Sequence, residues 1–144
     1  MNVTEVRRWH FRQIVELERF YGSKWKQGVA EYFSARGVIG WAAVEDGSVY
    51  GYAAAGLLRT GLRIVRVCVA PERCREGLGA TLVQAAVDWS VARGVYRILV
   101  HEPDLCEHGR ALMTSCGFAP AGDLMELHAP GRWKLQNRIK EYLS

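Results

Sequence analysis

Two glycines one residue apart, Gly77 and Gly79, stand in the stretch RCREGLGATL (73–82), where a long amphipathic helix should begin. Glycine is a poor helix former, but it lets the backbone approach another molecule closely. The first N–H groups of a helix lack intrahelical partners, and the helix dipole places partial positive charge beside them. A glycine-rich turn that opens a helix is therefore a candidate anion site, and a simple tight turn is the alternative.

The stretch does not match the common phosphate-binding motifs. It lacks the Lys-Ser or Lys-Thr pair of a Walker A loop, and position 82 is Leu where a dinucleotide fingerprint has its third glycine. Arginines crowd into the same segment, where they form either an attractive field for an anion or a solvated face. They are Arg59, Arg63, Arg66, Arg73 and Arg75.

The elements around this stretch follow from hydrophobic periodicity and from turn residues. Asp46-Gly47 lies between two apolar runs and predicts a β-hairpin. We expect helices over 10–21, 22–37 (with Ser23 as a possible cap), 77–93 and 107–116. We expect strands over 2–6, two in 38–58, then 62–69 and 96–101, and a final hairpin of 117–129 with 131–143.

The order of these elements defines the fold class. The crossover from strand 62–69 through helix 77–93 to strand 96–101 predicts a parallel pair, because such βαβ connections join parallel strands. The other strands are expected to pair mainly antiparallel. The sequence therefore predicts an α/β fold with a mixed, mostly antiparallel sheet, a central βαβ unit and flanking helices. No linker interrupts it, so residues 1–144 are expected to form a single domain.

Residues 62–122 resemble the GNAT superfamily of acyl-CoA-dependent N-acyltransferases. In that family a strand ending in V-x-P precedes [R/Q]-x-x-G-x-[G/A], a helix, a strand and a short helix ending in Gly-Phe. Here these are VCVAP, CREGLG and ALMTSCGF. The RimI-like protein N-terminal acetyltransferases are the nearest subgroup. The resemblance implies a GNAT-like fold and an N-acetyltransferase that uses acetyl-CoA as cosubstrate.

The resemblance also implies how acetyl-CoA would be held. The pantetheine arm would pair with the strand end at Val67, Cys68 and Val69, where a backbone N–H would also stabilise the oxyanion. The pyrophosphate would lie on the loop and the helix start, at Arg75, Glu76, Gly77, Leu78, Gly79 and Ala80.

Three positions depart from the family pattern. Cys74 stands where the family usually has Arg or Gln, and Cys106 stands where it often has Asn. Met113 replaces the Tyr that commonly protonates the departing CoA thiolate, and a thioether has no proton to donate. The family's general acid is therefore not assigned here, and a catalytically impaired CoA-binding or partner-binding module is the alternative function.

Attack by an amine on a thioester needs a proton acceptor, since amines are protonated at neutral pH. His101 ends the strand that follows the long helix, and the RimI-like subgroup places a catalytic Glu at about this position. An unperturbed histidine accepts a proton near neutral pH, so His101 is the predicted base. Glu102 is the alternative, and strand alternation would point it to the opposite face.

The acyl acceptor would be a primary amine of a protein N-terminus, a lysine or a small molecule, and it should lie near the two N-terminal helices. Glu16 or Glu18 would pair with a cationic amine. Aromatic side chains in this part of the chain would line its site, although such residues are commonly core. They are Tyr21, Trp25, Tyr32 and Trp41.

Composition and residue spacing argue against several other classes of protein. A net charge of +4 suits an anionic ligand but is too small to indicate a nucleic-acid partner. The four cysteines, and the group His101, Cys106 and His108, lack disulfide or metal-ligand spacing, so no metal is expected. No apolar run approaches the roughly 20 residues of a membrane span, and no secretory signal opens the chain. We expect a cytoplasmic protein that acts without a membrane, and a homodimer is left open as its assembly.

Overall fold

Seven strands form one sheet in the computed structural model, which describes residues 1–21, 28–74, 76–101 and 107–129. The sheet order is β1-β2-β3-β4-β5-β7-β6. The strands are β1 (Asn2–Glu5), β2 (Val38–Glu45), β3 (Ser48–Leu57), β4 (Leu62–Val69), β5 (Arg97–His101), β6 (Ala119–Ala121) and β7 (Leu124–His128). The helices are α1 (Phe11–Phe20), α2 (Val29–Ser34), α3 (Leu78–Ala92) and α4 (Glu107–Ser115), with 3-10 turns η1 (Arg8–His10) and η2 (Pro71–Arg73).

The β-hairpin expected at Asp46-Gly47 and the mainly antiparallel pairing of its neighbours are confirmed. Strands β2 and β3 pair antiparallel around Asp46 and Gly47, whose φ angles of 50° and 78° suit a hairpin turn. Strand β4 then pairs antiparallel with β3. The predicted parallel pair is confirmed as well, because β4 and β5 run parallel on either side of the α3 crossover. The fold is therefore the α/β mixed sheet that the sequence predicts.

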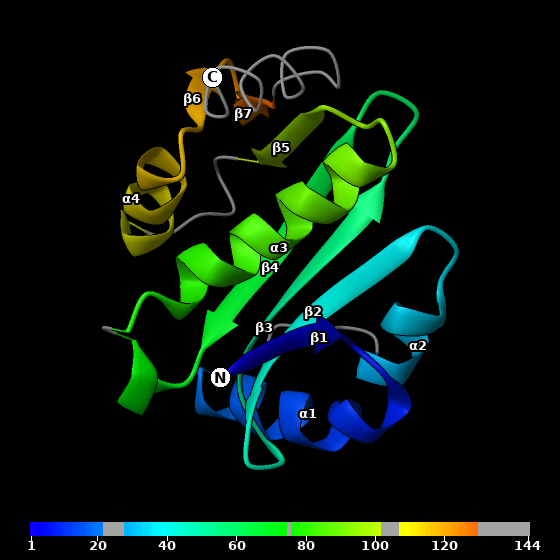
Figure 1. The fold of residues 1–144 in the computed structure, drawn as a ribbon, viewed down its shortest axis with the longest axis vertical. Helices are drawn as coiled ribbons and strands as arrows, with labels where there is room; N and C mark the ends of the chain where they lie inside the picture. The colour runs from blue at the N-terminus through cyan, green and yellow to red at the C-terminus, as the bar shows by residue number, and fades with distance from the viewer. Residues whose placement is uncertain (22–27, 75, 102–106, 130–144) are drawn as a thin grey trace, which may run out of the picture.

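Helices cover both faces of the sheet (Figure 1). Helix α3 packs on one face, where its Leu82 and Ala86 join Ile64 of β4 and Ile98 of β5 in the larger core. Helix α4 contributes Met113 to the same core. Helices α1 and α2 lie on the other face, over a smaller core that includes Ile14, Val29, Tyr52 and Cys68. The two faces of β4 thus belong to different cores.

A β-bulge divides β4 into two parts. Ala55 of β3 pairs with Ile64 and Ala54 pairs with Arg66, which leaves Val65 as the extra residue. Before the bulge, Leu62 and Ile64 face α3; after it, Val67 packs with the α3 core and Cys68 with the α1 core. The inserted residue therefore reverses which face the even-numbered side chains occupy.

The C-terminal expectation needs correction. The segment 117–129, predicted as one strand, contains both β6 and β7, which pair antiparallel around Gly122 and Asp123. Gly122 has a φ of +64°, a left-handed conformation that favours glycine and permits the tight turn. The other half of the expected hairpin, 131–143, lies outside the described residues. The three-residue edge strand β6 contains Pro120, and all its side chains are exposed.

The second N-terminal helix is shorter in the described residues than the expected 22–37. Helix α2 starts after Gly28 and ends at Ser34, while Ser23 lies outside the described part of the chain. In the described segments no helix is long and apolar enough to cross a membrane.

Candidate functional site

The centre of the site is an open edge of β4. Among the described residues, β4 pairs with β5 only at Leu62↔Ile98 and Arg63↔Leu99, before the bulge. The Ala70 N–H donates to the Tyr50 carbonyl of β3 at 2.7 Å. Because alternate residues of an antiparallel strand turn their polar backbone groups to the same side, Cys68 also faces β3. The backbone N–H and C=O groups of Val67 and Val69 therefore face the open edge.

The three residues predicted to bind the pantetheine arm differ in the direction of their backbone groups. Val67 and Val69 present backbone groups to an added chain segment, whereas Cys68 directs its backbone to β3 and its side chain into the α1 core. Burial, together with the nearby Glu18, raises the pKa of the Cys68 thiol to about 12. The thiol therefore stays protonated and behaves as a small apolar side chain.

Beyond β4, the chain turns through η2 into the N-terminus of α3. Gly77 caps this helix with a φ of +73°, and nothing lies within 4 Å of where its Cβ would be. Gly77 thus supplies both the left-handed turn and open space in front of the helix N-terminus. The geometry fits an anion at Gly77, Leu78 and Ala80, where the first helical N–H groups begin.

Gly79 has a different structural reason. A Cβ at Gly79 would lie 3.1 Å from Cδ2 of Leu112, so its missing side chain makes room for α4. Packing of α3 against α4 therefore explains the glycine at position 79, whereas the left-handed turn explains the glycine at position 77. The sequence pattern alone could not separate these causes.

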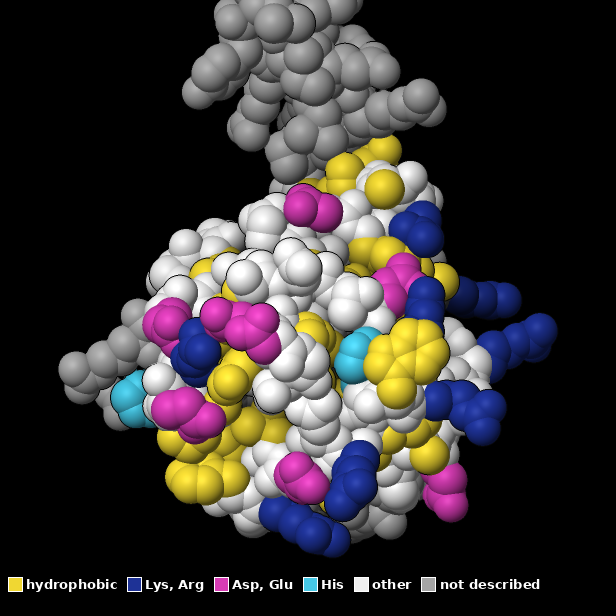
Figure 2. All heavy atoms as spheres, turned by 60° about the horizontal axis from the view of Figure 1, so that its bottom comes forward, with side chains coloured by type: hydrophobic (Ala, Val, Ile, Leu, Met, Phe, Trp, Pro, Cys, Tyr) yellow, Lys and Arg dark blue, Asp and Glu magenta, His cyan; other side chains and the backbone are white. Residues whose placement is uncertain are grey.

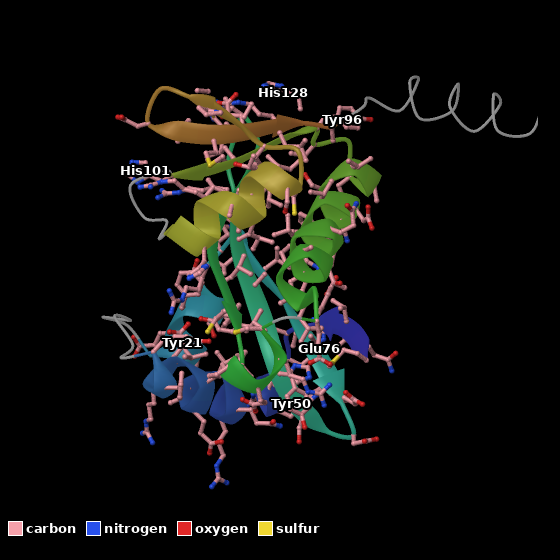
Figure 3. All side chains as sticks on the ribbon, turned by 90° about the vertical axis from the view of Figure 1, so that its left-hand side faces the viewer. Tyr21, Tyr50, Glu76, Tyr96, His101 and His128 are labelled. Carbon is pink, nitrogen blue, oxygen red and sulfur yellow. The ribbon has the colours of Figure 1, made fainter. Side chains whose placement is uncertain are left out.

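Arg73 ties the loop to the β2–β3 hairpin. Its guanidinium forms ion pairs with Glu45 at 3.0 Å and with Glu76 at 3.2 Å, and it lies 4.3 Å from the centre of the Tyr50 ring. Glu76 and Tyr50 lie close together at the lower end of the molecule in Figure 3. The positive charge of Arg73 is therefore shared with two carboxylates beside the candidate anion site. Arg75 lies outside the described residues.

Tyr21, at the end of α1, reaches the open edge. Its hydroxyl donates to the Val69 carbonyl at 2.5 Å and lies 3.7 Å from Sγ of Cys74. Burial, and then the hydrogen bond with Cys74, raises the pKa of the Tyr21 phenol, so the hydroxyl keeps its proton. Cys74, at the position where the family usually has Arg or Gln, is exposed and lies beside the Ala70 carbonyl at 3.4 Å.

His101 ends β5 on the face opposite α3. Ile98 and Val100 belong to the α3 core, so alternation turns His101 to the face that carries α1 and α2. Figure 3 shows His101 at the end of β5, on the same side of the molecule as Tyr21. His101 follows two residues after the last β4–β5 pair, beyond the point where the strands separate. Glu102 lies outside the described residues, and Met113 is buried in the α3 core.

The expected acceptor residues divide between the two faces. Tyr21 and Tyr32 lie with α1 and α2, and burial raises the pKa of the Tyr32 phenol. Trp41, by contrast, is 4% exposed and packs edge-on against Trp89 in the α3 core, so its role is structural. Trp25 lies outside the described residues.

The two carboxylates expected to meet a cationic amine differ as well. Glu16 is exposed, with a loose ion pair to Arg12 at 3.7 Å. Glu18 is 1% exposed, and both of its oxygens accept hydrogen bonds from Arg66. Figure 2 shows this end of the molecule, where several basic side chains project on the right and acidic side chains are spread over the left, the upper part and the lower right.

Sequence reasoning missed the pairing of Arg66 with Glu18. The Arg66 Nε and Nη2 atoms each lie 2.7 Å from a carboxylate oxygen of Glu18, and the Tyr52 hydroxyl also donates to this carboxylate. The feature of the sequence that could have indicated this pairing is Arg66 itself, an arginine within a mostly apolar strand. In the described part of the chain, no three His, Cys, Asp or Glu side chains gather as metal ligands would.

The architecture is that of solved N-acetyltransferases. One is the ribosomal-protein-S18-alanine N-acetyltransferase from Escherichia coli, with a TM-score of 0.76 and 16% identity over 90% of this chain and 95% of that chain. Another is an aminoglycoside 6'-acetyltransferase type Ii, with a TM-score of 0.77 and 21% identity over 90% of this chain and 99% of that chain. At such low identity these similarities show the fold.

A third similar structure contains coenzyme A. It is the PaiA N-acetyltransferase from Thermoplasma acidophilum in complex with coenzyme A, with a TM-score of 0.67 and 14% identity over 89% of this chain and 99% of that chain. No curated protein sequence matches this chain. The sequence model of the acetyltransferase (GNAT) family, however, matches residues 5–118. By that match across most of its length, the chain belongs to the GNAT acetyltransferase family.

Proposed function

We propose that residues 1–144 act as a single N-acetyltransferase domain, which transfers the acetyl group of acetyl-CoA to a primary amine in a ternary complex. The open edge of β4, which leads directly to the N-terminus of α3, is the observation that carries this proposal. It offers extended backbone groups for the pantetheine arm and helical N–H groups for the pyrophosphate. The coenzyme A complexes among the similar structures support the same ligand.

In the proposed reaction the neutral amine nitrogen attacks the thioester carbon. The Val67 N–H, at the open edge, would donate to the oxyanion that forms. Collapse of this species breaks the C–S bond, and the thiolate leaves with the electron pair and takes up a proton. His101 would accept the proton that the amine loses, with Glu102 as the alternative base. Arg75, Glu76 and Gly79 complete the proposed pyrophosphate loop.

The acceptor is proposed only as a class of amine. The similar structures include enzymes named for an alanine of a ribosomal protein and for aminoglycosides. A panel of alanine-terminated peptides, lysine peptides, polyamines and aminoglycosides therefore covers the proposed range.

Ligand binding and turnover test the proposal separately. Acetyl-CoA should raise the melting temperature more than ATP or NAD at equal excess, because a ligand that binds only the folded state stabilises it. Thiol release with the amine panel then measures turnover. His101→Ala should lower turnover by about 100-fold while acetyl-CoA still stabilises the chain. An unchanged rate would reject His101 as the base.

A catalytically impaired CoA-binding module is the second candidate function. The buried thioether of Met113 favours it, since this side chain cannot protonate a leaving thiolate. Stabilisation by acetyl-CoA without thiol release from any amine in the panel would support this second function over the first.

A further inference from the structure

Glu18 lies in the smaller core, where it is surrounded by apolar side chains. It is 1% exposed, while Ile14 and Tyr52, which belong to the same core, are fully buried. Taking a carboxylate out of water is unfavourable unless hydrogen bonds and an opposite charge compensate for it. Arg66 provides both through its two bonds at 2.7 Å, and Tyr52 adds a third donor. The cluster therefore fixes the Arg66 side chain on the α1 face.

The position of Arg66 in β4 links its pairing with Glu18 to the direction of the neighbouring backbone N–H groups. Arg66 directly follows the bulge residue Val65 and directly precedes Val67. Side-chain direction and backbone direction alternate together along a strand, so the face of one side chain determines where the next N–H points. With Arg66 on the α1 face, the Val67 N–H faces the open edge and Cys68 pairs with β3.

A strand without the bulge would have the opposite arrangement. Arg66 would then turn toward α3, among apolar side chains such as Leu82 and Val83, and Val67 would turn its N–H to β3. The arrangement without the bulge is unfavourable, because Arg66 would lose its ion pair with Glu18 and its guanidinium would enter an apolar core.

We infer that Glu18 is a positioning residue for acyl transfer: by holding Arg66 on the α1 face, it fixes the β4 bulge at Val65 and aims the Val67 N–H at the open edge. This inference rests on the proposed function for its catalytic consequence. Its structural part, the direction of the β4 amides, holds independently of any ligand.

Hydrogen exchange measured by NMR tests the structural part. In the unaltered chain the amides of Cys68 and Ala70, which face β3, should exchange slowly, and those of Val67 and Val69 should exchange fast. Glu18→Gln removes the charge while keeping the shape, and it should reduce protection of Cys68 and Ala70 at least tenfold relative to Ala53 in β3. Arg66→Ala should give the same change in protection, and it replaces Glu18→Gln as the test if Glu18→Gln folds poorly.

Turnover tests the catalytic part. Glu18→Gln should lower kcat by about tenfold or more, measured well below its melting temperature and per folded molecule. The matched control is Arg12→Gln, because Arg12 lies on the same helix and its side chain is 91% exposed. This control should leave kcat and the exchange pattern unchanged. Tyr52→Phe, which keeps the ion pair, should have a smaller effect than Glu18→Gln.

The outcomes separate this inference from the proposed function. Unchanged protection at Cys68 and Ala70 in both Glu18→Gln and Arg66→Ala would overturn the inference, as would an unchanged kcat in a turnover-competent chain. If the unaltered chain neither binds acetyl-CoA nor releases thiol, the proposed function and the catalytic part fail. The exchange pattern would still decide the structural part.

Discussion

The hydroxyl of Tyr21 lies 2.5 Å from the carbonyl oxygen of Val69, on the edge of β4 that is open to an added strand. Helix α1 thus places a hydrogen-bond donor where the amide of a pantetheine arm would donate in the proposed complex. In that complex the two donors would compete for one carbonyl, so we expect the strength of coenzyme binding to depend on Tyr21, which directly follows α1.

Replacing Tyr21 by Phe tests this competition. We expect Tyr21→Phe to bind acetyl-CoA about fivefold more tightly, because a hydrogen bond of about 1 kcal/mol no longer has to be exchanged. Isothermal titration calorimetry gives the dissociation constant. Tyr32→Phe is the control, since Tyr32 packs edge-on against Phe33 instead. Weaker binding by Tyr21→Phe would mean that the hydroxyl assists the ligand.

The two glycines of the loop should respond differently to alanine. Gly77→Ala should lower the free energy of unfolding by about 1 kcal/mol, because its φ of +73° is unfavourable for an L-residue. Gly79→Ala should stay within about 0.5 kcal/mol, because the helix-propensity gain offsets a small shift of the Leu112 methyl. Urea unfolding measures both, and equal losses would contradict the separate roles assigned to the glycines.

Charge at the loop provides a third test. Glu76→Gln should strengthen acetyl-CoA binding about threefold, since it removes a carboxylate beside the proposed pyrophosphate site. Arg73→Ala should weaken binding by a similar factor, because Glu45 and Glu76 then lose their shared cation. Both effects should shrink as salt is added, because these side chains are solvent-accessible. Titrations at low and high ionic strength check this, and salt-independent effects would indicate a change in loop shape.

His10 should make the fold sensitive to mild acid. Its Nδ1 accepts the Arg7 N–H at 2.9 Å, and burial, followed by the charge of Arg7, lowers the pKa of this imidazole below 6.5. The unfolded chain therefore binds the proton more readily. The stability contribution is complete above the unfolded pKa and is lost as the pH falls toward the lower folded value.

The measurement is the free energy of unfolding at about pH 7.5 and about pH 5, where unfolded histidine is mostly neutral and mostly charged respectively. His10→Asn removes this titration, so its free energy should fall less between the two conditions than that of the unaltered chain. Equal losses in the two proteins would assign the acid sensitivity to other groups.

Much of the fold was predictable because its signals are local. The Asp46-Gly47 hairpin and the strand–helix–strand crossover each depend on neighbouring residues, and both are confirmed. The predicted C-terminal hairpin is wrong because it puts the turn at Pro130-Gly131, between 117–129 and 131–143, whereas Gly122 with its positive φ makes a turn within 117–129. Two turn signals close together leave the strand boundaries ambiguous in sequence alone.

The candidate site was predictable only where chain neighbours build it. The loop at Gly77 follows from local pattern, whereas the contact of Arg66 with Glu18 joins residues 48 positions apart. The bulge at Val65 is also invisible to simple alternation, because a single inserted residue reverses the expected faces of Val67 and Cys68. Such relationships depend on which elements pack together.

The edge strand β6 has a consequence for solubility. Exposed strand edges can recruit strands from other molecules and so begin aggregation. Strand β6 has three residues, and its central Pro120 has no N–H with which to bond an incoming chain. This end of the sheet is therefore a poor template for intermolecular strand addition, and it limits one route to aggregation at high concentration.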